Sequence, residues 1–504
     1  MNNASKKGPG IARKYMYFGI GAIIFLIFAY VPLSENFLIS NEAILTPEGR
    51  LSLAILFFCV FLWVTEPIPF HITGIIGMIA MTFARIVDIN TGRIATFDDI
   101  VRLGFGHNTI VFFIGVLTLS TVITKSGIGK RIAMFILTIT GNKSSNVLLG
   151  FLIAGTVISF FITDMAVAAM LMPIAKSLCE EEKLVPLKSN FGRALLIGVA
   201  WSATIGGSGT PAAGGANIIA FDMIRNTLGY DLGFLEWMMY GVPAAMVMLI
   251  PGWLLLLLFF KPEMKYLSRT KEQFVEEFKA LGPMSRNEKS TAVIFFVTVT
   301  LWIAGDFISP LIGINIGAAL PAFLCTVLFF LPGVTDYKWK EISNDISWES
   351  VILIATGIAM GMTMFNSGAA AWMAETFLGG LFAMHPFMQI TIAVFVVSLI
   401  KVILSSNTVT ASIIMPVIIA MVVSRLDAGM YIPVMGLGLI FPVAISLSFC
   451  FILVTSAPTN VIPYSTGYFT MMDFAKPGII MTVISSVLMA VVMLGIGSLT
   501  GLFG

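Results

Sequence analysis

Two short polar motifs interrupt apolar segments of this chain and are its best candidates for chemistry. Thr163-Asp164-Met165 forms the first tip and Ser406-Asn407-Thr408 the second tip, at an offset of 243 residues (406 − 163). Thr163 and Ser406 suit the N-cap position, so a helix should begin at each tip with its partly positive N-terminus facing the other. In a membrane interior, two facing helix N-termini would hold an anion with two negative ends. The alternative is that these polar groups only hydrogen-bond neighbouring helices.

A second pair of polar breaks has the same offset. Residues 206–217 and 455–460 both contain proline, threonine and asparagine within apolar surroundings, and the first also contains five glycines. Asn460 follows Asn217 by 243 residues (460 − 217). Glycine and proline interrupt a helix and free backbone groups that can hold a cation or a carboxylate. We therefore predict two broken helices beside the tips. Together with the tips, they give the predicted substrate-binding set: Thr163, Asp164, Thr210, Asn217, Ser406, Asn407, Thr408, Ala457, Pro458 and Asn460.

Two charged residues lie within apolar segments, where burying a charge costs free energy. Asp164 is at the first tip, and Lys401 precedes Ser406 by five residues (406 − 401) in an apolar segment. Ionisable groups inside a membrane indicate function and a partner. We predict that Lys401 is a fixed counter-charge for the substrate, with Asp164 as its partner. The alternatives are that Lys401 snorkels to the surface and that Asp164 only caps a helix.

Composition identifies the class of protein that positions these groups. The chain has 504 residues, of which 58% are hydrophobic and 11% charged, and its mean hydropathy is +0.96. These values exclude an ordinary soluble domain. The four cysteines are scattered, which indicates neither disulfides nor a metal site. Nothing indicates nucleic-acid binding or a cofactor, and an intramembrane aspartyl enzyme would need a second carboxylate opposite Asp164, so no enzyme is expected.

The predicted elements form an all-α membrane protein of two inverted repeats. Two re-entrant hairpins, 146–177 and 386–421, carry the tips, and two surface-lying arms, 126–142 and 367–384, connect elements. Eleven spanning segments are expected at roughly 17–33, 51–66, 68–86, 110–125, 191–222, 236–260, 291–308, 316–332, 349–366, 432–467 and 474–500. The basic residues of the loops favour a cytoplasmic N-terminus in an inner, plasma membrane.

These motifs, together with the string from Trp63 to Pro69, resemble those of the divalent anion/sodium symporter family, the INDY-type di- and tricarboxylate transporters. The resemblance spans essentially the whole chain. It implies a homodimer in which a transport domain moves by an elevator mechanism against a scaffold domain, and it implies substrate roles for the two tips and both broken helices. The implied parts are 1–142 and 291–384 for the scaffold, 143–260 and 385–504 for transport, and 261–290 for a cytoplasmic linker.

Two departures from the family pattern bear on ion coupling. The first tip reads Thr-Asp-Met where the family has Ser-Asn-Thr, and Gly215-Ala216 stands where the family has Pro-Pro. Both positions belong to a sodium site of the family, so the chain resembles the sodium-independent exchanger branch. We therefore predict exchange of C4 and C5 dicarboxylates such as malate, succinate, fumarate and 2-oxoglutarate.

Two alternatives remain open. The first is a sodium-coupled dicarboxylate symporter, with a residual sodium site near Ser406 and Asn407. The second is an anion channel, which would not need the paired hairpins.

Overall fold

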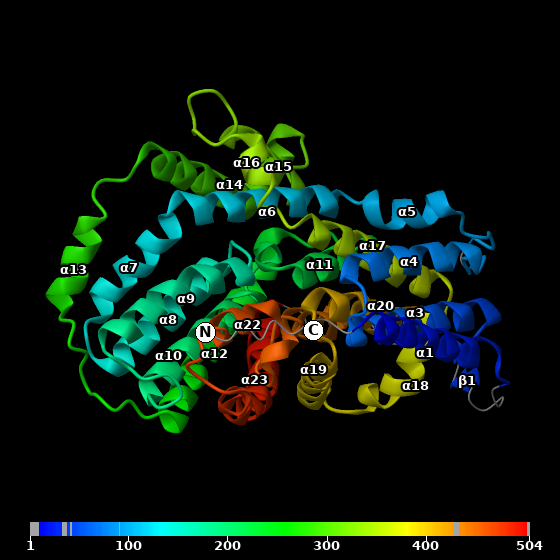
Figure 1. Ribbon diagram of the computed structural model, residues 1–504. Coiled ribbons are helices and arrows are strands. Elements are labelled where there is room, and N and C mark those ends of the chain that lie inside the picture. The colour runs from blue at the N-terminus through cyan, green and yellow to red at the C-terminus, as the bar shows by residue number, and fades with distance from the viewer. Residues whose placement is uncertain (1–9, 33–37, 41–42, 90, 428–432, 501–504) are drawn as a thin grey trace. The chain divides into compact units, whose positions relative to one another are not determined.

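The computed structural model describes residues 10–32, 38–40, 43–89, 91–427 and 433–500, which are almost entirely helical (Figure 1). A short antiparallel pair joins β1 (Ile39–Ser40) to β2 (Ala43–Ile44), with Ile39 opposite Ile44. The chain divides into two compact units. Unit 1 comprises Met1–His107, Trp348–Ala383 and Ser412–Tyr431, and unit 2 comprises Asn108–Ser347, Met384–Ala411 and Ile432–Gly504.

Unit 1 is a helical assembly in which α1 packs on α3, and α17 packs on both α4 and α5. Glycine allows close approach: a Cβ on Gly104 of α5 would collide with the Ala355 carbonyl of α17. The chain breaks at Glu66, which ends α3 in the left-handed region with φ 48° and is followed by prolines. The helices of unit 1 are α1 (Ile11–Tyr30), α3 (Pro47–Thr65), α4 (Phe70–Phe83), α5 (Phe97–Phe105), α17 (Trp348–Asn366), α18 (Ala369–Leu378) and the 3₁₀ turn η2 (Gly379–Ala383).

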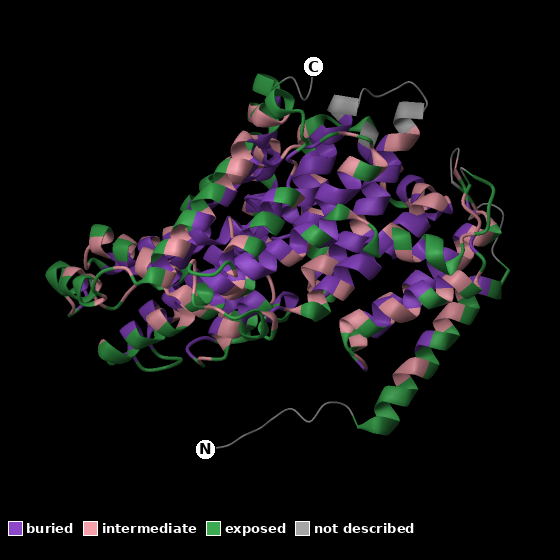
Figure 2. Ribbon diagram, turned by 90° about the horizontal axis from the view of Figure 1, so that it is seen from above, coloured by how far each residue is buried: buried purple, intermediate pink, exposed green. Residues whose placement is uncertain are grey.

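Unit 2 contains both tips and both breaks. Its helix α10 is buried along nearly its whole length and packs on α8, α9 and α12. Figure 2 shows buried residues in purple along many of the helices. The elements of its first part are α6 (Asn108–Ser126), α7 (Ile128–Thr140), α8 (Ser144–Ser159), α9 (Asp164–Glu181), α10 (Asn190–Gly206), η1 (Pro211–Ala213), α11 (Gly215–Thr227) and α12 (Phe234–Phe259). The remaining elements are α13 (Lys271–Ala280), α14 (Arg286–Ile312), α15 (Ala319–Phe329), α16 (Trp339–Ser343), α19 (Pro386–Ile403), α21 (Pro433–Ser446), η3 (Val454–Ser456), α22 (Pro458–Tyr464) and α23 (Met471–Thr500). Helix α20 (Asn407–Asp427) begins in unit 2 and continues into unit 1.

Within the described residues, nine helices are long and apolar enough to cross a membrane, so the chain is a multi-pass membrane protein. Seven of them are α1, α3, α6, α12, α14, α17 and α23, which coincide with predicted spans. The other two are α19 and the described apolar part of α20, the arms of the second hairpin. The predicted spans 68–86 and 316–332 contain shorter helices, α4 and α15, because proline or glycine lies at their ends. The spans 191–222 and 432–467 are broken helices, as the polar breaks predict.

The offset of 243 residues recurs in the boundaries of the structural elements. Helix α9 begins at Asp164 and α20 at Asn407 (407 − 164); η1 begins at Pro211 and η3 at Val454 (454 − 211). Helices α11 and α22 begin at Gly215 and Pro458, again 243 apart (458 − 215). The two halves of the sequence therefore fold with the same local pattern at the tips and breaks.

The predicted domain boundaries and the compact units differ in part, because residues 108–142 and 291–347 pack within unit 2. Compactness does not identify the moving part, so the scaffold and transport assignment stays a prediction. The two predicted connecting arms contain α7 and α18, whose N-caps Gly127 and Gly368 have φ of 85° and 75°. Only glycine adopts this left-handed geometry without strain, which explains the Ser-Gly start of each arm.

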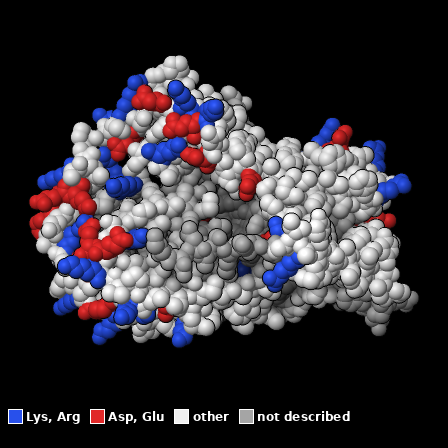
Figure 3. All heavy atoms as spheres, viewed as in Figure 1, with Lys and Arg blue, Asp and Glu red and all other residues white. Residues whose placement is uncertain are grey.

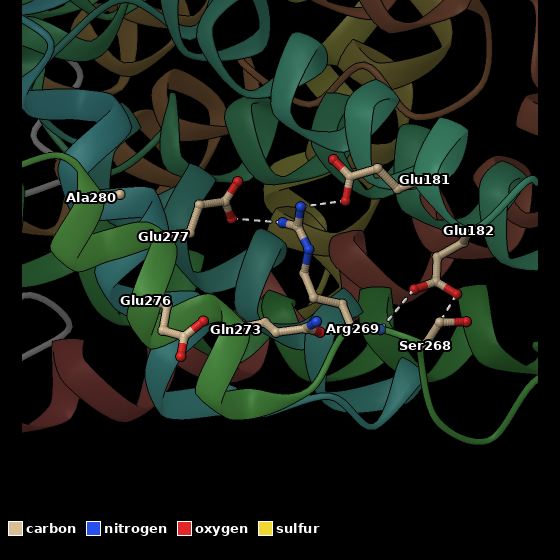
Figure 4. A pocket seen from close by; sticks show the side chains of 8 residues that line it. All are labelled: Glu181, Glu182, Ser268, Arg269, Gln273, Glu276, Glu277 and Ala280. Carbon is tan, nitrogen blue, oxygen red and sulfur yellow. Dashed lines mark hydrogen bonds and ion pairs between the residues drawn. The ribbon is translucent and has the colours of Figure 1, made fainter.

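The charged linker contains α13, which Thr270 and Gln273 start with a capping box. Arg269 bridges Glu181, at the end of α9, and Glu277 on α13 (Figure 4). These residues line a cavity of about 500 Å³ far along α9 from its start at the first tip. Charged side chains also gather over α13 on the face shown in Figure 3. The polar surface of α13 agrees in character with the predicted linker, whose cytoplasmic location stays a prediction.

Candidate substrate site at two helix starts and two broken helices

One buried asparagine stabilises the loop that interrupts the helix in the first half. The first loop, residues 207–214 between α10 and α11, curls around the fully buried Asn217. The Asn217 amide nitrogen donates to the carbonyl oxygens of Gly207 at 2.7 Å and Thr210 at 2.8 Å. Because Gly207 and Thr210 lie where the helical pattern stops, the side chain supplies donors to carbonyls at the break. Asn217 thus fixes the shape of the loop.

The break in the second half repeats this arrangement. The second loop, residues 447–457 between α21 and α22, surrounds Asn460, which is also fully buried. Its amide nitrogen donates to the carbonyl oxygens of Cys450 at 2.8 Å and Leu453 at 3.3 Å. Cys450 and Leu453 follow Gly207 and Thr210 by the same 243 residues (450 − 207 and 453 − 210). The sequence repeat is therefore also a repeat of hydrogen bonds.

The two asparagines differ at their amide oxygens. The hydroxyl of Ser448 lies 3.2 Å from Asn217 Oδ1 and 3.1 Å from the Gly207 carbonyl oxygen, so it can donate to either. The position that matches Ser448 in the first half is Ile205, which has no polar group to offer Asn460. Asn460 Oδ1 is buried and has no hydrogen-bond partner among the residues that the structure describes. A buried acceptor without a hydrogen bond raises the free energy of the folded protein, so binding of a cation or another donor to this oxygen would be favourable.

The first tip presents a carboxylate at the start of α9. Asp164 Oδ1 accepts from the Met165 N–H at 2.7 Å, and the Thr459 side chain interacts with the same carboxylate. A Cβ on Gly207 would lie 3.4 Å from the Asp164 Cβ, so the tip touches the first loop. Among the described residues, no cationic nitrogen lies within the 4.0 Å of an ion pair with Asp164.

Thr163 occupies the N-cap position, but its side chain makes no capping bond. The predicted capping role of this hydroxyl is therefore wrong. Its oxygen lies 3.4 Å from the Ser120 hydroxyl on α6 instead, and the Ser120 oxygen also accepts from the Thr163 N–H. Contact with another helix has replaced the local capping bond.

The second tip begins α20 as predicted. The Ser406 hydroxyl accepts from the Val409 N–H at 3.3 Å, which is the capping bond expected of it. Asn407 Oδ1 accepts from the Cys450 thiol at 2.9 Å, so the second tip touches the second loop. Thr408 is half-buried beside them. The side chains of the second tip are thus positioned by α20 itself and by the second loop.

Lys401 is buried in unit 2. Its side chain is 1% exposed, which contradicts the snorkelling alternative. The ammonium donates to the Leu447 carbonyl oxygen at the start of the second loop and interacts electrostatically with Cys450. Lys401 and Asp164 interact electrostatically, but they form no direct ion pair. The ammonium instead donates to the nearby loop carbonyl, and the predicted partnership of Lys401 with Asp164 stays a prediction.

The predicted site residues separate into two groups by exposure. Both tips are half-buried, and Pro458 at the start of α22 is exposed, so these residues can meet a solute. By contrast, Thr210, Asn217, Ala457 and Asn460 are buried, and Thr210 donates its hydroxyl proton to the Phe160 carbonyl oxygen. These four buried residues pack within the loops, and we call them the frame residues.

Sequence reasoning missed Ser448, Cys450 and Thr459, which contact Asn217, Asn407 and Asp164. A signal was available for the first two: at the offset of 243 they match Ile205 and Gly207, so polarity differs between the halves.

Comparison with known proteins agrees with this architecture. Residues 18–501 match the family model described as the sodium:sulfate symporter transmembrane region. The chain is 25% identical to the sodium-dependent dicarboxylate transporter SdcS of Staphylococcus saprophyticus over 98% of its length and 96% of that protein. It is 26% identical to SdcS of Staphylococcus aureus over 97% of its length and 92% of that protein.

Among solved structures, the Alcanivorax borkumensis transporter YdaH matches 88% of this chain and 98% of its own, with a TM-score of 0.51 and 12% identity. At that identity the likeness concerns the fold alone. The family match covers nearly the whole chain and confirms the resemblance seen in the sequence motifs. The protein is therefore not an enzyme but a membrane transporter that belongs to the sodium:sulfate symporter family.

Proposed function

We propose that this protein transports C4 and C5 dicarboxylates such as succinate and malate and couples their uptake to sodium. The substrate class is supported by the SdcS relatives and by hydroxyl and amide donors at the start of α20. Sodium coupling replaces the sodium-independent exchange expected from the first tip, since the relatives are named sodium-dependent.

The observation that carries sodium coupling is the carboxylate of Asp164. It lies at the first tip with no cationic nitrogen within 4.0 Å among the described residues, beside the broken helix at Gly207. A partly buried carboxylate without a cation is unfavourable, and carbonyls of broken helices together with carboxylates suit sodium. The aspartate that distinguishes this tip from the family pattern therefore strengthens a cation site. The orphaned Asn460 Oδ1 offers one further oxygen in the second half.

The substrate carboxylates are proposed to bind between the tips. Ser406, Asn407 and Thr408 present hydroxyl, amide and backbone donors beside the N-terminus of α20, and Thr163 does so beside α9. Lys401 contributes a positive potential from beneath the second loop without contacting bulk water. The frame residues Thr210, Asn217, Ala457 and Asn460 hold the loops in shape, and Pro458 lines the site.

The finer organisation follows from the same proposal. The protein is a homodimer in the plasma membrane with a cytoplasmic N-terminus, as the distribution of basic residues favours. The parts that carry the two tips move by an elevator mechanism while the remaining helices form the scaffold. The offset of 243 residues in element boundaries supports two inverted repeats, since such repeats place their broken helices at one site.

Uptake of radiolabelled succinate into proteoliposomes tests the proposal. Vesicles are prepared with and without internal succinate and assayed in sodium, potassium and choline buffers. We expect uptake by empty vesicles that requires external sodium. Equal uptake in all three buffers, with a strict need for internal succinate, would restore the exchange reading.

Two variants connect the result to Asp164. Asp164→Asn removes the charge at constant size and should raise the sodium concentration for half-maximal uptake about tenfold, which corresponds to about 1.4 kcal/mol. Asp336→Asn makes the same change on an exposed loop residue and should behave as the wild type. An unchanged sodium dependence in Asp164→Asn would remove this carboxylate from the cation site.

A further inference from the structure

A chain of three polar side chains runs from the buried lysine to the second tip. The Lys401 ammonium interacts electrostatically with Cys450, and the Cys450 thiol donates to Asn407 Oδ1 at 2.9 Å. Lys401 and Cys450 are 1% and 2% exposed, whereas Asn407 is half-buried. The chain therefore begins in the protein interior and ends at a residue that a solute can reach.

The chain determines how the Asn407 amide is turned. A primary amide has an acceptor oxygen and a donor NH₂ group, and rotation by half a turn exchanges them. A thiol has a single proton, which Cys450 donates to Asn407 Oδ1, and the Lys401 ammonium places positive charge near the same sulfur. The group that faces this sulfur should therefore be an acceptor, because a second donor would meet a positive centre. The oxygen faces Cys450, and the NH₂ group is directed away from it.

The thiol has a second possible acceptor, which is weaker. The Ser456 carbonyl oxygen lies 3.7 Å from the Cys450 sulfur, against 2.9 Å for Asn407 Oδ1. Hydrogen bonds weaken as their length increases, so the proton is directed to Asn407. The Asn407 amide is therefore the main partner of the thiol.

The first half of the site has no equivalent of the contacts that join Lys401, Cys450 and Asn407. The position matching Cys450 is Gly207, which has no side chain, and the position matching Lys401 is Ile158. The residue matching Asn407 is Asp164, whose carboxylate can only accept. Polar groups in the first half thus favour a cation, while a fixed NH₂ group in the second half favours an anion.

We propose that Cys450 is a positioning residue for substrate binding, because its thiol, which Lys401 also contacts, holds the Asn407 amide with NH₂ toward the substrate carboxylate. Without the thiol the amide can turn its oxygen toward the same carboxylate, which repels it. This inference rests on the proposed function, because it concerns the same dicarboxylate site. Cys450 itself is buried and does not touch the substrate.

Three variants test the role of the thiol. In Cys450→Ala the Asn407 oxygen loses its donor, and we expect the succinate Kd and KM to rise about tenfold with little change in maximal rate. Cys450→Ser supplies a hydroxyl donor and should return both constants to within about twofold of the wild type. Cys325→Ala is the matched control, a buried cysteine whose thiol donates to the Ala322 carbonyl oxygen in α15, and should bind succinate normally.

Binding is measured on purified protein by isothermal titration with succinate, and uptake is measured in proteoliposomes. A wild-type Kd in Cys450→Ala overturns the inference. So does equal loss of affinity in the alanine and serine variants, since that pattern indicates packing. A loss of maximal rate at unchanged KM also contradicts it. The proposed function fails separately, when the wild-type protein neither binds nor takes up succinate.

Discussion

Asn217 and Asn460 occupy matching positions in the two halves, so the losses of folding stability on truncating each of them can be compared. Asn217 takes part in three hydrogen bonds, to Gly207, Thr210 and Ser448, whereas Asn460 takes part in two. A buried hydrogen bond contributes about 1 kcal/mol of net stability. Truncation to alanine should therefore cost about 3 kcal/mol at Asn217 and about 2 kcal/mol at Asn460. The expected difference of about 1 kcal/mol comes from the Ser448 hydroxyl.

Thermostability in detergent measures this order. Each variant is heated, and the fraction left in the monodisperse peak of a size-exclusion column gives a half-loss temperature. We expect the order wild type, Asn460→Ala, Asn217→Ala, with Asn344→Ala as an exposed control near the wild type. In a Ser448→Ala background the gap between the two asparagine variants should close. An Asn460→Ala protein that is as unstable as Asn217→Ala, or less stable, would refute the reasoning.

Further predictions concern the tips, the buried charge and pH. Asn407→Ala should weaken succinate binding by about 1.5–3 kcal/mol, as for a hydrogen bond to a charged group, and titration calorimetry on folded protein checks this; unchanged affinity would exclude a contact with substrate. Lys401→Met should abolish most transport in proteoliposomes while the protein still elutes as the wild type does. The combination with Asp164→Asn should be less harmful than the sum of the single changes, because the two charges interact; strict additivity would show that they do not. Partial burial raises the pKa of the Glu263 carboxyl, but hydrogen bonds from Ser189 and from the N–H groups that start α10 lower it more, and the net pKa is below 4.5. A depressed pKa stabilises the folded protein above pH 4.5, so Glu263→Gln should be less thermostable than the wild type at pH 7, with a gap that shrinks below pH 4.5; a gap independent of pH would contradict this.

Much of the architecture follows from the sequence alone, because its causes are local. Apolar composition and segment length determine that the chain is a multi-pass helical membrane protein. Glycine marks the end of α10 at Gly206-Gly207 and proline marks the start of α22 at Pro458, since neither residue readily continues a helix from the preceding residues. The offset of 243 residues links the two halves before any contact is known. The family resemblance rests on these same features.

Tertiary structure decided which polar groups meet, because the partners are far apart in the chain. Ser448 reaches Asn217 across 231 residues, and Cys450 reaches Asn407 across 43 residues. Lys401 contacts the Leu447 carbonyl oxygen rather than Asp164, since an ammonium in a dry interior binds the acceptor that packing brings nearest. Local propensity contains no information on such pairings. The sequence thus determines the polar groups of the site, and packing alone decides which of them are satisfied and which remain available to a cation or an anion.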